Sequence, residues 1–181
     1  GYFSSSRWFS VLDLNAKTNL YGGTYVSTTE SPAVGGRSSS HNNCVVNVYS
    51  GTIIRGNAGG NALYAVNKAG LNICGGTVIE GVIYDQSSAR GVTVSGNPQI
   101  GKLLLPDGVT ITVGELTEGA DITVDTDGVF TKPFDKAKEY LTAGYFQPAS
   151  AISVTDDNAL SMNKVQQLCP HCNVPVEEIE W

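Results

Sequence analysis

A short motif that returns every 25 to 28 residues constrains the fold of this 181-residue chain more than any other feature of its sequence. The three copies begin at Asn19, Asn47 and Asn72, and they read NLYGGTYV, NVYSGTII and NICGGTVI without gaps. A weaker copy, VTVSGN, occupies residues 92–97. A period in the twenties, with short β-rich strands and a glycine corner in each unit, is typical of a β-solenoid in which each unit forms one coil.

Equivalent residues of neighbouring coils are expected to stack above one another, because a single coil cannot bury its own apolar face. Corner asparagines can hydrogen-bond to one another, and corner glycines supply the backbone freedom that a sharp bend needs. The predicted ladders of these two residue types are Asn19, Asn47 and Asn72, and Gly23, Gly51 and Gly76. Two inward apolar ladders are predicted, one of Leu20, Val48 and Ile73 and the other of Tyr25, Ile53 and Val78.

The composition favours an all-β fold, since charged residues make up only 15% of the chain and 21 residues are glycine. A short helix is predicted only within residues 132–141, where Pro133 stands near the start. We expect β-helix coils and closing strands over residues 1–131 and a β-rich C-terminal extension over 132–162. Residues 163–181 are expected to form a tail or inter-module linker.

Residues 103–120, LLLPDGVTITVGELTEGA, and residues 128–131, GVFT, resemble the closing segment of a known class of module. These are right-handed parallel β-helix repeat modules of very large secreted or surface, adhesin-like proteins of gut Gram-positive bacteria. The Gly-Gly-Thr rungs resemble their coils, and residues 145–146 and 156–160 resemble the strands that follow. The resemblance implies a right-handed parallel β-helix, an extracellular or cell-surface location in a bacterium, and no assigned reaction.

The four cysteines offer one further motif, Cys169-Pro-His-Cys172, close to the end of the chain. A CxxC suits thioredoxin-like redox chemistry only at a helix N-terminus after a strand, and no such context is predicted here. It also supplies half of a tetrahedral zinc site, which another module or chain would have to complete. A local disulfide or two free thiols at a module junction is the simplest reading. Cys44 and Cys74 fall in different slots of adjacent coils, so we expect buried free thiols.

Catalysis is not expected. A polysaccharide lyase or hydrolase, the enzyme classes considered, needs clustered carboxylates facing one groove. The first 98 residues contain only four acids, which do not share a repeat slot: Asp13, Glu30, Glu80 and Asp85. No cofactor is therefore predicted apart from the zinc alternative at the CxxC.

Aromatic residues give two candidate contact surfaces. Tyr21 and Tyr49 share a slot and would form either a stacking platform for glycans or an aromatic ladder in the solenoid wall. The N-terminal segment GYFSSSRWF is rich in aromatic residues and would cap the first coil or pack on a neighbour. The residues assigned to that assembly contact are Tyr2, Phe3, Trp8 and Phe9.

The net charge and its distribution along the chain indicate which classes of partner the protein can bind. The net charge of −6 argues against nucleic acid, and no apolar run is long enough for a membrane helix. Residues 1–98 carry a net charge of +2 and residues 99–181 a net charge of −8, which favours head-to-tail contact between copies or neighbouring modules. The sequence thus predicts a non-catalytic extracellular structural module that stacks end to end into a rod or fibre, with host or bacterial glycan binding as the alternative.

Overall fold

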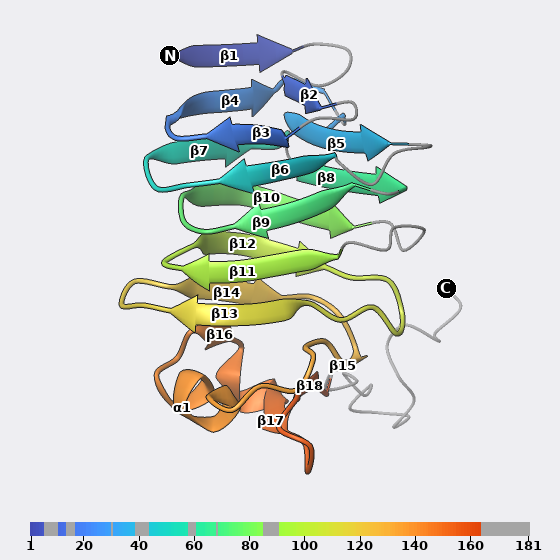
Figure 1. Cartoon of the computed structure of the whole chain (residues 1–181), viewed down its shortest axis with the longest axis vertical. Coiled ribbons are helices and arrows are strands. Elements are labelled where there is room, and N and C mark those ends of the chain that lie inside the picture. The colour runs from blue at the N-terminus through green and yellow to red at the C-terminus, as the bar shows by residue number, and fades with distance from the viewer. Residues whose placement is uncertain are drawn as a thin grey trace, which may run out of the picture.

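The computed structural model describes residues 1–5, 11–13, 17–29, 31–38, 44–57, 61–67, 69–84 and 91–163. Two large parallel sheets form the walls of a β-solenoid of about four turns (Figure 1). The five-stranded sheet contains β3 (Lys17–Leu20), β6 (Val45–Val48), β9 (Gly70–Ile73), β11 (Val92–Gly96) and β13 (Thr112–Leu116). The all-β solenoid predicted from the repeats is therefore confirmed.

The ten-stranded sheet follows two paths that meet at β10. The main path contains β1 (Tyr2–Ser5), β4 (Gly23–Ser27), β7 (Thr52–Arg55), β10 (Thr77–Tyr84), β12 (Gln99–Leu104), β14 (Asp121–Val124) and β16 (Phe146–Gln147). The second path runs through β2 (Val11–Asp13), β5 (Val34–Ser38) and β8 (Asn61–Asn67). In Figure 1 the five-stranded sheet faces the viewer with its strands pointing left, the main path points right behind it, and the chain descends, so the coil is right-handed.

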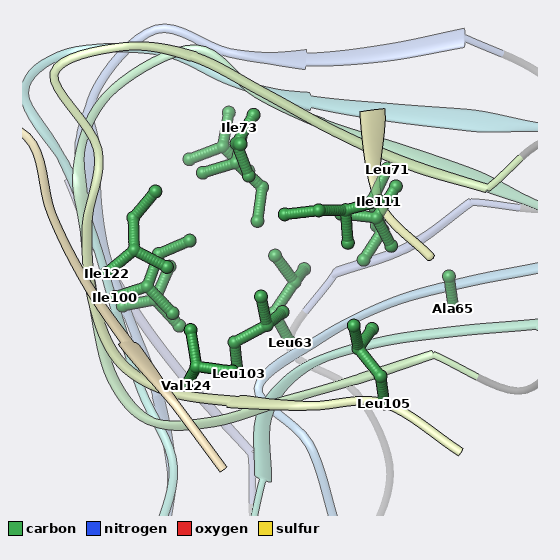
Figure 2. Packing of buried hydrophobic residues seen from close by; sticks show 14 of the residues in the cluster. Leu63, Ala65, Leu71, Ile73, Ile100, Leu103, Leu105, Ile111, Ile122 and Val124 are labelled. Atoms are coloured by element: carbon green, nitrogen blue, oxygen red, sulfur yellow. The ribbon is translucent and has the colours of Figure 1, made fainter. Parts of the chain in front are cut away.

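The core fills the space enclosed by the coils, because alternate side chains of each strand point inward. In β7, for example, Thr52 and Ile54 are buried and Ile53 and Arg55 are exposed. Figure 2 shows Leu63, Ile73 and Ile100 converging from different strands onto the same interior. All three are at most 2% exposed, so every turn contributes to one continuous apolar column.

The register corrects one of the two predicted apolar ladders. Tyr25 pairs with Ile54, and Ile54 pairs with Val78, so Ile54 stands where Ile53 was expected. Ile54 is fully buried, whereas Ile53 is 39% exposed. The second coil holds one more residue at its corner, where buried Thr52 donates a hydrogen bond from its Oγ1 to the carbonyl of Leu20 at 2.8 Å. The prediction was wrong at this position because the gapless alignment of the repeats requires corners of equal length in every coil.

A compact cap covers the C-terminal end of the solenoid (Figure 1). It contains α1 (Ala137–Thr142), which begins inside the segment 132–141 predicted to be helical and ends one residue beyond it, and a short 3-10 turn, η1 (Ala149–Ala151). An antiparallel sheet of β15 (Gly128–Val129), β18 (Leu160–Met162) and β17 (Ile152–Val154) completes it. Phe130 and Phe146 are fully buried with ring centroids 5.8 Å apart, so the cap extends the core beyond the last coil.

Among the described residues, no helix has both the length and the apolar character that crossing a membrane requires.

We expect Ile54→Ala to lower the free energy of unfolding by about 2–5 kcal/mol, because it leaves a cavity in the inward ladder. The matched control, Ile53→Ala, should change it by less than about 1 kcal/mol because its side chain faces outward. Urea denaturation followed by circular dichroism measures both. Equal losses, or a larger loss for Ile53→Ala, would contradict the register.

Candidate functional site

The asparagine ladder runs along one corner of the solenoid. Asn19 pairs in register with Asn47, and Asn47 pairs with Asn72. Asn47 donates from Nδ2 to Oδ1 of Asn19 at 2.9 Å, and its own Oδ1 accepts from Nδ2 of Asn72 at 2.7 Å. Thr93 occupies the next rung, which ends the ladder. Since Asn47 is only 3% exposed and its amide bonds on both sides, these residues hold coils together rather than offering a ligand site.

The corner glycines allow neighbouring coils to approach closely. Gly76 has a φ of +83°, and a Cβ added there would lie 2.8 Å from the carbonyl oxygen of Thr52 in the preceding coil. Gly96, in the weaker fourth copy of the motif, is tighter still, with 2.4 Å to the carbonyl oxygen of Cys74. Both positions therefore exclude any side chain. The predicted ladder of Gly23, Gly51 and Gly76 is wrong at its second member, because Gly23 pairs with Thr52 and the extra corner residue of the second coil moves Gly51 out of register.

Tyr21 and Tyr49 lie side by side on the outside of this corner. Their rings are nearly parallel, with centroids 4.6 Å apart, and Tyr21 is 70% exposed. Loss of hydration against its neighbours raises the pKa of the Tyr49 hydroxyl, and Tyr21 and Cys74 raise it further. The stack covers one face of each ring, and the 70% exposure of Tyr21 leaves its other face open to solvent.

A shallow polar hollow lies in the same series of corners. Its volume is about 190 Å³. The residues that line it are Ser50, Gly51, Gly76, Thr77, Asn97 and Gln99. Hydroxyl and amide groups of this kind can exchange hydrogen bonds with a sugar, while an exposed tyrosine can stack on one.

The N-terminal rung presents a second exposed aromatic surface. β1 is the last strand of the main path, and Tyr2 and Phe3 are 67% and 49% exposed. The ring of Phe3 stacks on Tyr25 with centroids 5.1 Å apart and an interplanar angle of 7°. Of the other two residues assigned to this contact, Trp8 and Phe9 lie outside the described residues.

The cysteine predictions have different outcomes. Neither Cys44 nor Cys74 forms a disulfide, but only Cys44 is buried. Cys74 is half-buried, because it follows inward-facing Ile73 and so points outward at the corner. The CxxC residues Cys169 and Cys172 lie outside the described residues, as do the side chains of Asp13, Glu30, Glu80 and Asp85. No group of three or more His, Cys, Asp or Glu side chains that could hold a metal occurs within the described part of the chain.

A further pocket lies among residues that the sequence did not indicate as a site. It has a volume of about 350 Å³ and lies between β13 and the segment that leads into α1. Its lining residues are Val113, Gly114, Glu115, Phe134, Asp135, Lys136 and Tyr140. The only local signal for it in the sequence is Pro133, which cannot donate a backbone hydrogen bond to a neighbouring strand.

No protein-family model, curated protein or solved structure matches the chain. The chain is therefore classified by its fold alone, which is a parallel β-solenoid with a small C-terminal cap.

Removing the central amide of the asparagine ladder should destabilise the protein. We expect Asn47→Ala to lower the free energy of unfolding by about 1–3 kcal/mol, because it removes two hydrogen bonds made by a side chain that is only 3% exposed. Asn19→Ala, at the exposed end of the ladder, should cost less than about 1 kcal/mol. Chemical denaturation of the two variants makes the comparison, and a ladder that contributes nothing would give two small and equal losses.

Proposed function

We propose that the chain is a non-catalytic structural module whose N-terminal rung stacks on a further β-solenoid rung. Stacking of this kind extends a rod or fibre end to end. The observation that carries the proposal is the open, aromatic edge of β1.

The backbone of β1 is arranged to receive another strand. Thr24 donates its N–H to the carbonyl of Gly1 at 2.8 Å, and Phe3 is in register with Tyr25. Alternation along the strand therefore turns the backbone groups of Tyr2 and Ser4 away from β4. Within the described residues no strand pairs with that outer side. An unprotected edge is a template for pairing with another chain.

Two stacks of aromatic rings also end at the N-terminal end of the solenoid and would favour the addition of a rung there. Phe3 continues the column of Tyr25, and Tyr21 continues that of Tyr49, so both columns end on exposed rings at the N-terminal end. An added rung that carried an aromatic residue in either slot would cover these rings and gain both buried apolar area and ring stacking.

Charge and the cap favour one orientation. The cap covers the last coil, so within the described residues only the N-terminal end presents the open edge of a whole rung. The net charge of +2 on residues 1–98 and −8 on residues 99–181 favours a head-to-tail contact of the N-terminal rung with an acidic end. The partner is therefore a copy of this chain or a neighbouring module.

The location proposed for this role is the surface or the secreted material of a bacterium. It is supported by the resemblance of residues 103–120 and 128–131 to β-helix modules of such proteins.

A glycan-binding role is the second candidate, and the exposure of Tyr21 favours it. The free face of Tyr21 and the polar hollow at Ser50 and Asn97 occupy the same series of corners. Together they offer a ring for stacking and amide and hydroxyl groups for hydrogen bonds.

Assembly through β1 is tested by Ser4→Pro and Phe3→Lys. Proline at Ser4 removes an N–H that faces away from β4, and lysine at Phe3 places a charge where another rung would pack. We expect the unmodified chain to form rods in electron microscopy at low salt and both variants to remain dispersed. Val129→Lys is the matched control, because it replaces another exposed apolar side chain (45%) at the capped end.

Dispersed monomers of the unmodified chain at both low and high salt would contradict stacking between copies. Rods that form equally well in all variants would place the contact elsewhere.

The glycan role predicts a different pattern. Titration with soluble oligosaccharides, followed by nuclear magnetic resonance, should perturb the amides of residues 49–51 and 97. Tyr21→Ala should weaken binding at least tenfold, which is the effect of losing about 1.4 kcal/mol of stacking. Tyr2→Ala, which removes an equally exposed tyrosine elsewhere, should leave it unchanged. Equal effects of the two variants would count against this site.

A further inference from the structure

The pocket at the cap contains an interrupted strand ladder. Ile111 donates its N–H to the carbonyl of Phe130, and its own carbonyl accepts from the N–H of Lys132, both at 2.9 Å. Ile111 also bridges Thr131 in the parallel sense, so the chain at residues 130–132 begins as a further strand beside β13. If this pairing continued, the N–H of residue 134 would bond to the carbonyl of Val113.

The ladder stops because the chain turns away after Lys132. Pro133 has no N–H, and Phe134 donates its N–H to the carbonyl of Asn158 at 3.0 Å. The alternation set by Ile111 directs the N–H and C=O of Val113 toward the same side of β13. That side faces away from β11, the strand with which β13 pairs, and Val113 lines the pocket there.

Tyr140 supplies a third polar group. Its side chain is 2% exposed and lines the pocket, and its hydroxyl oxygen accepts the N–H of Leu116 at 3.0 Å. The hydroxyl hydrogen has no acceptor among the described residues. Buried polar groups are almost always paired, so this donor is available to an incoming acceptor.

The N–H and C=O of Val113 and the hydroxyl of Tyr140 suit a peptide backbone better than a ligand that offers a single hydroxyl group. The Val113 N–H needs an acceptor and its C=O needs a donor, and an extended peptide offers both along one edge. The Tyr140 hydroxyl takes a second carbonyl. The half-buried ring of Phe134 gives a neighbouring side chain an apolar surface, and the volume of about 350 Å³ lies within the usual range for ligand pockets.

The rim selects for positive charge. Glu115 and Asp135 are exposed at the pocket, and among its described lining residues the only cation is Lys136, whose Nζ lies 5.7 Å from the ring centroid of Tyr140. Residues 99–163, which surround the pocket in sequence, carry ten acidic and four basic side chains. Such a surface attracts cationic segments at moderate ionic strength.

We propose that this pocket binds a short extended peptide segment carrying basic side chains, which adds to the edge of β13 as a partial strand. This function is independent of stacking at β1, because it uses the opposite end of the solenoid.

The experiment uses the full chain labelled with ¹⁵N and the peptide acetyl-Lys-Val-Lys amide. We expect saturable shifts of the Val113 and Gly114 amide signals at millimolar peptide. The same peptide methylated at every backbone nitrogen should bind at least tenfold more weakly, since it cannot donate to the Val113 carbonyl. Acetyl-Glu-Val-Glu amide should also bind at least tenfold more weakly, because the rim repels it.

The double variant Glu115→Gln and Asp135→Asn tests the rim without altering the core. It should weaken binding of the basic peptide several-fold and reduce its dependence on salt. The matched control, Asp107→Asn and Glu118→Gln, removes the same charge from exposed residues that do not line the pocket, and should have little effect.

Three results would overturn the proposal. The first is the absence of any saturable shift at Val113 in folded protein. The second is equal binding of the methylated and unmethylated peptides, which would exclude strand addition. The third is a shift of Val113 by a methyl glycoside when the peptides have no effect, which would assign the pocket to a sugar.

Discussion

The structure depends on one constraint, that each coil is completed only by the coil above and below it. Backbone pairing is parallel throughout both large sheets, and the inward side chains Leu20, Val48 and Ile73 stand in register from coil to coil. Asn47 shows how strictly this register is kept, because its amide bonds to equivalent amides on both sides at 2.9 and 2.7 Å. A shift of one residue would break these bonds and expose the core face.

The first and last coils of such a stack each have a neighbouring coil on one side only, and the two ends of this solenoid differ in how the other side is covered. At the C-terminal end, Phe130 and Phe146 carry the core into a cap where α1 and an antiparallel sheet replace the regular coils. At the N-terminal end, within the described residues, the main path stops at β1 with the rings of Tyr2 and Phe3 exposed. This asymmetry supports the proposal that a partner of the same architecture stacks on the N-terminal rung.

The sequence alone was sufficient to predict the structural features that repeat from coil to coil. The spacing of Asn19, Asn47 and Asn72 carried the coil period and its register, because stacking requires the same residue type at the same place in each coil. It was insufficient where corner length varies, so Ile53 was placed inward although Ile54 fills that position. The pocket at β13 could not be foreseen either, because it depends on a bond from Phe134 to Asn158, and no repeat relates those residues.

Both proposed surfaces arise where backbone pairing ends, and their dimensions separate their partners. β1 offers an edge of four residues with stacked aromatic rings beside it, which suits another rung of a solenoid. The free edge at Val113 is bounded by residues 130–132 on one side and by the hydroxyl of Tyr140 bonded to Leu116 on the other. A whole rung cannot enter so short a gap, whereas a few residues of extended chain can. The two proposals therefore assign the long pairing edge to a whole rung and the short one to a few residues of extended chain.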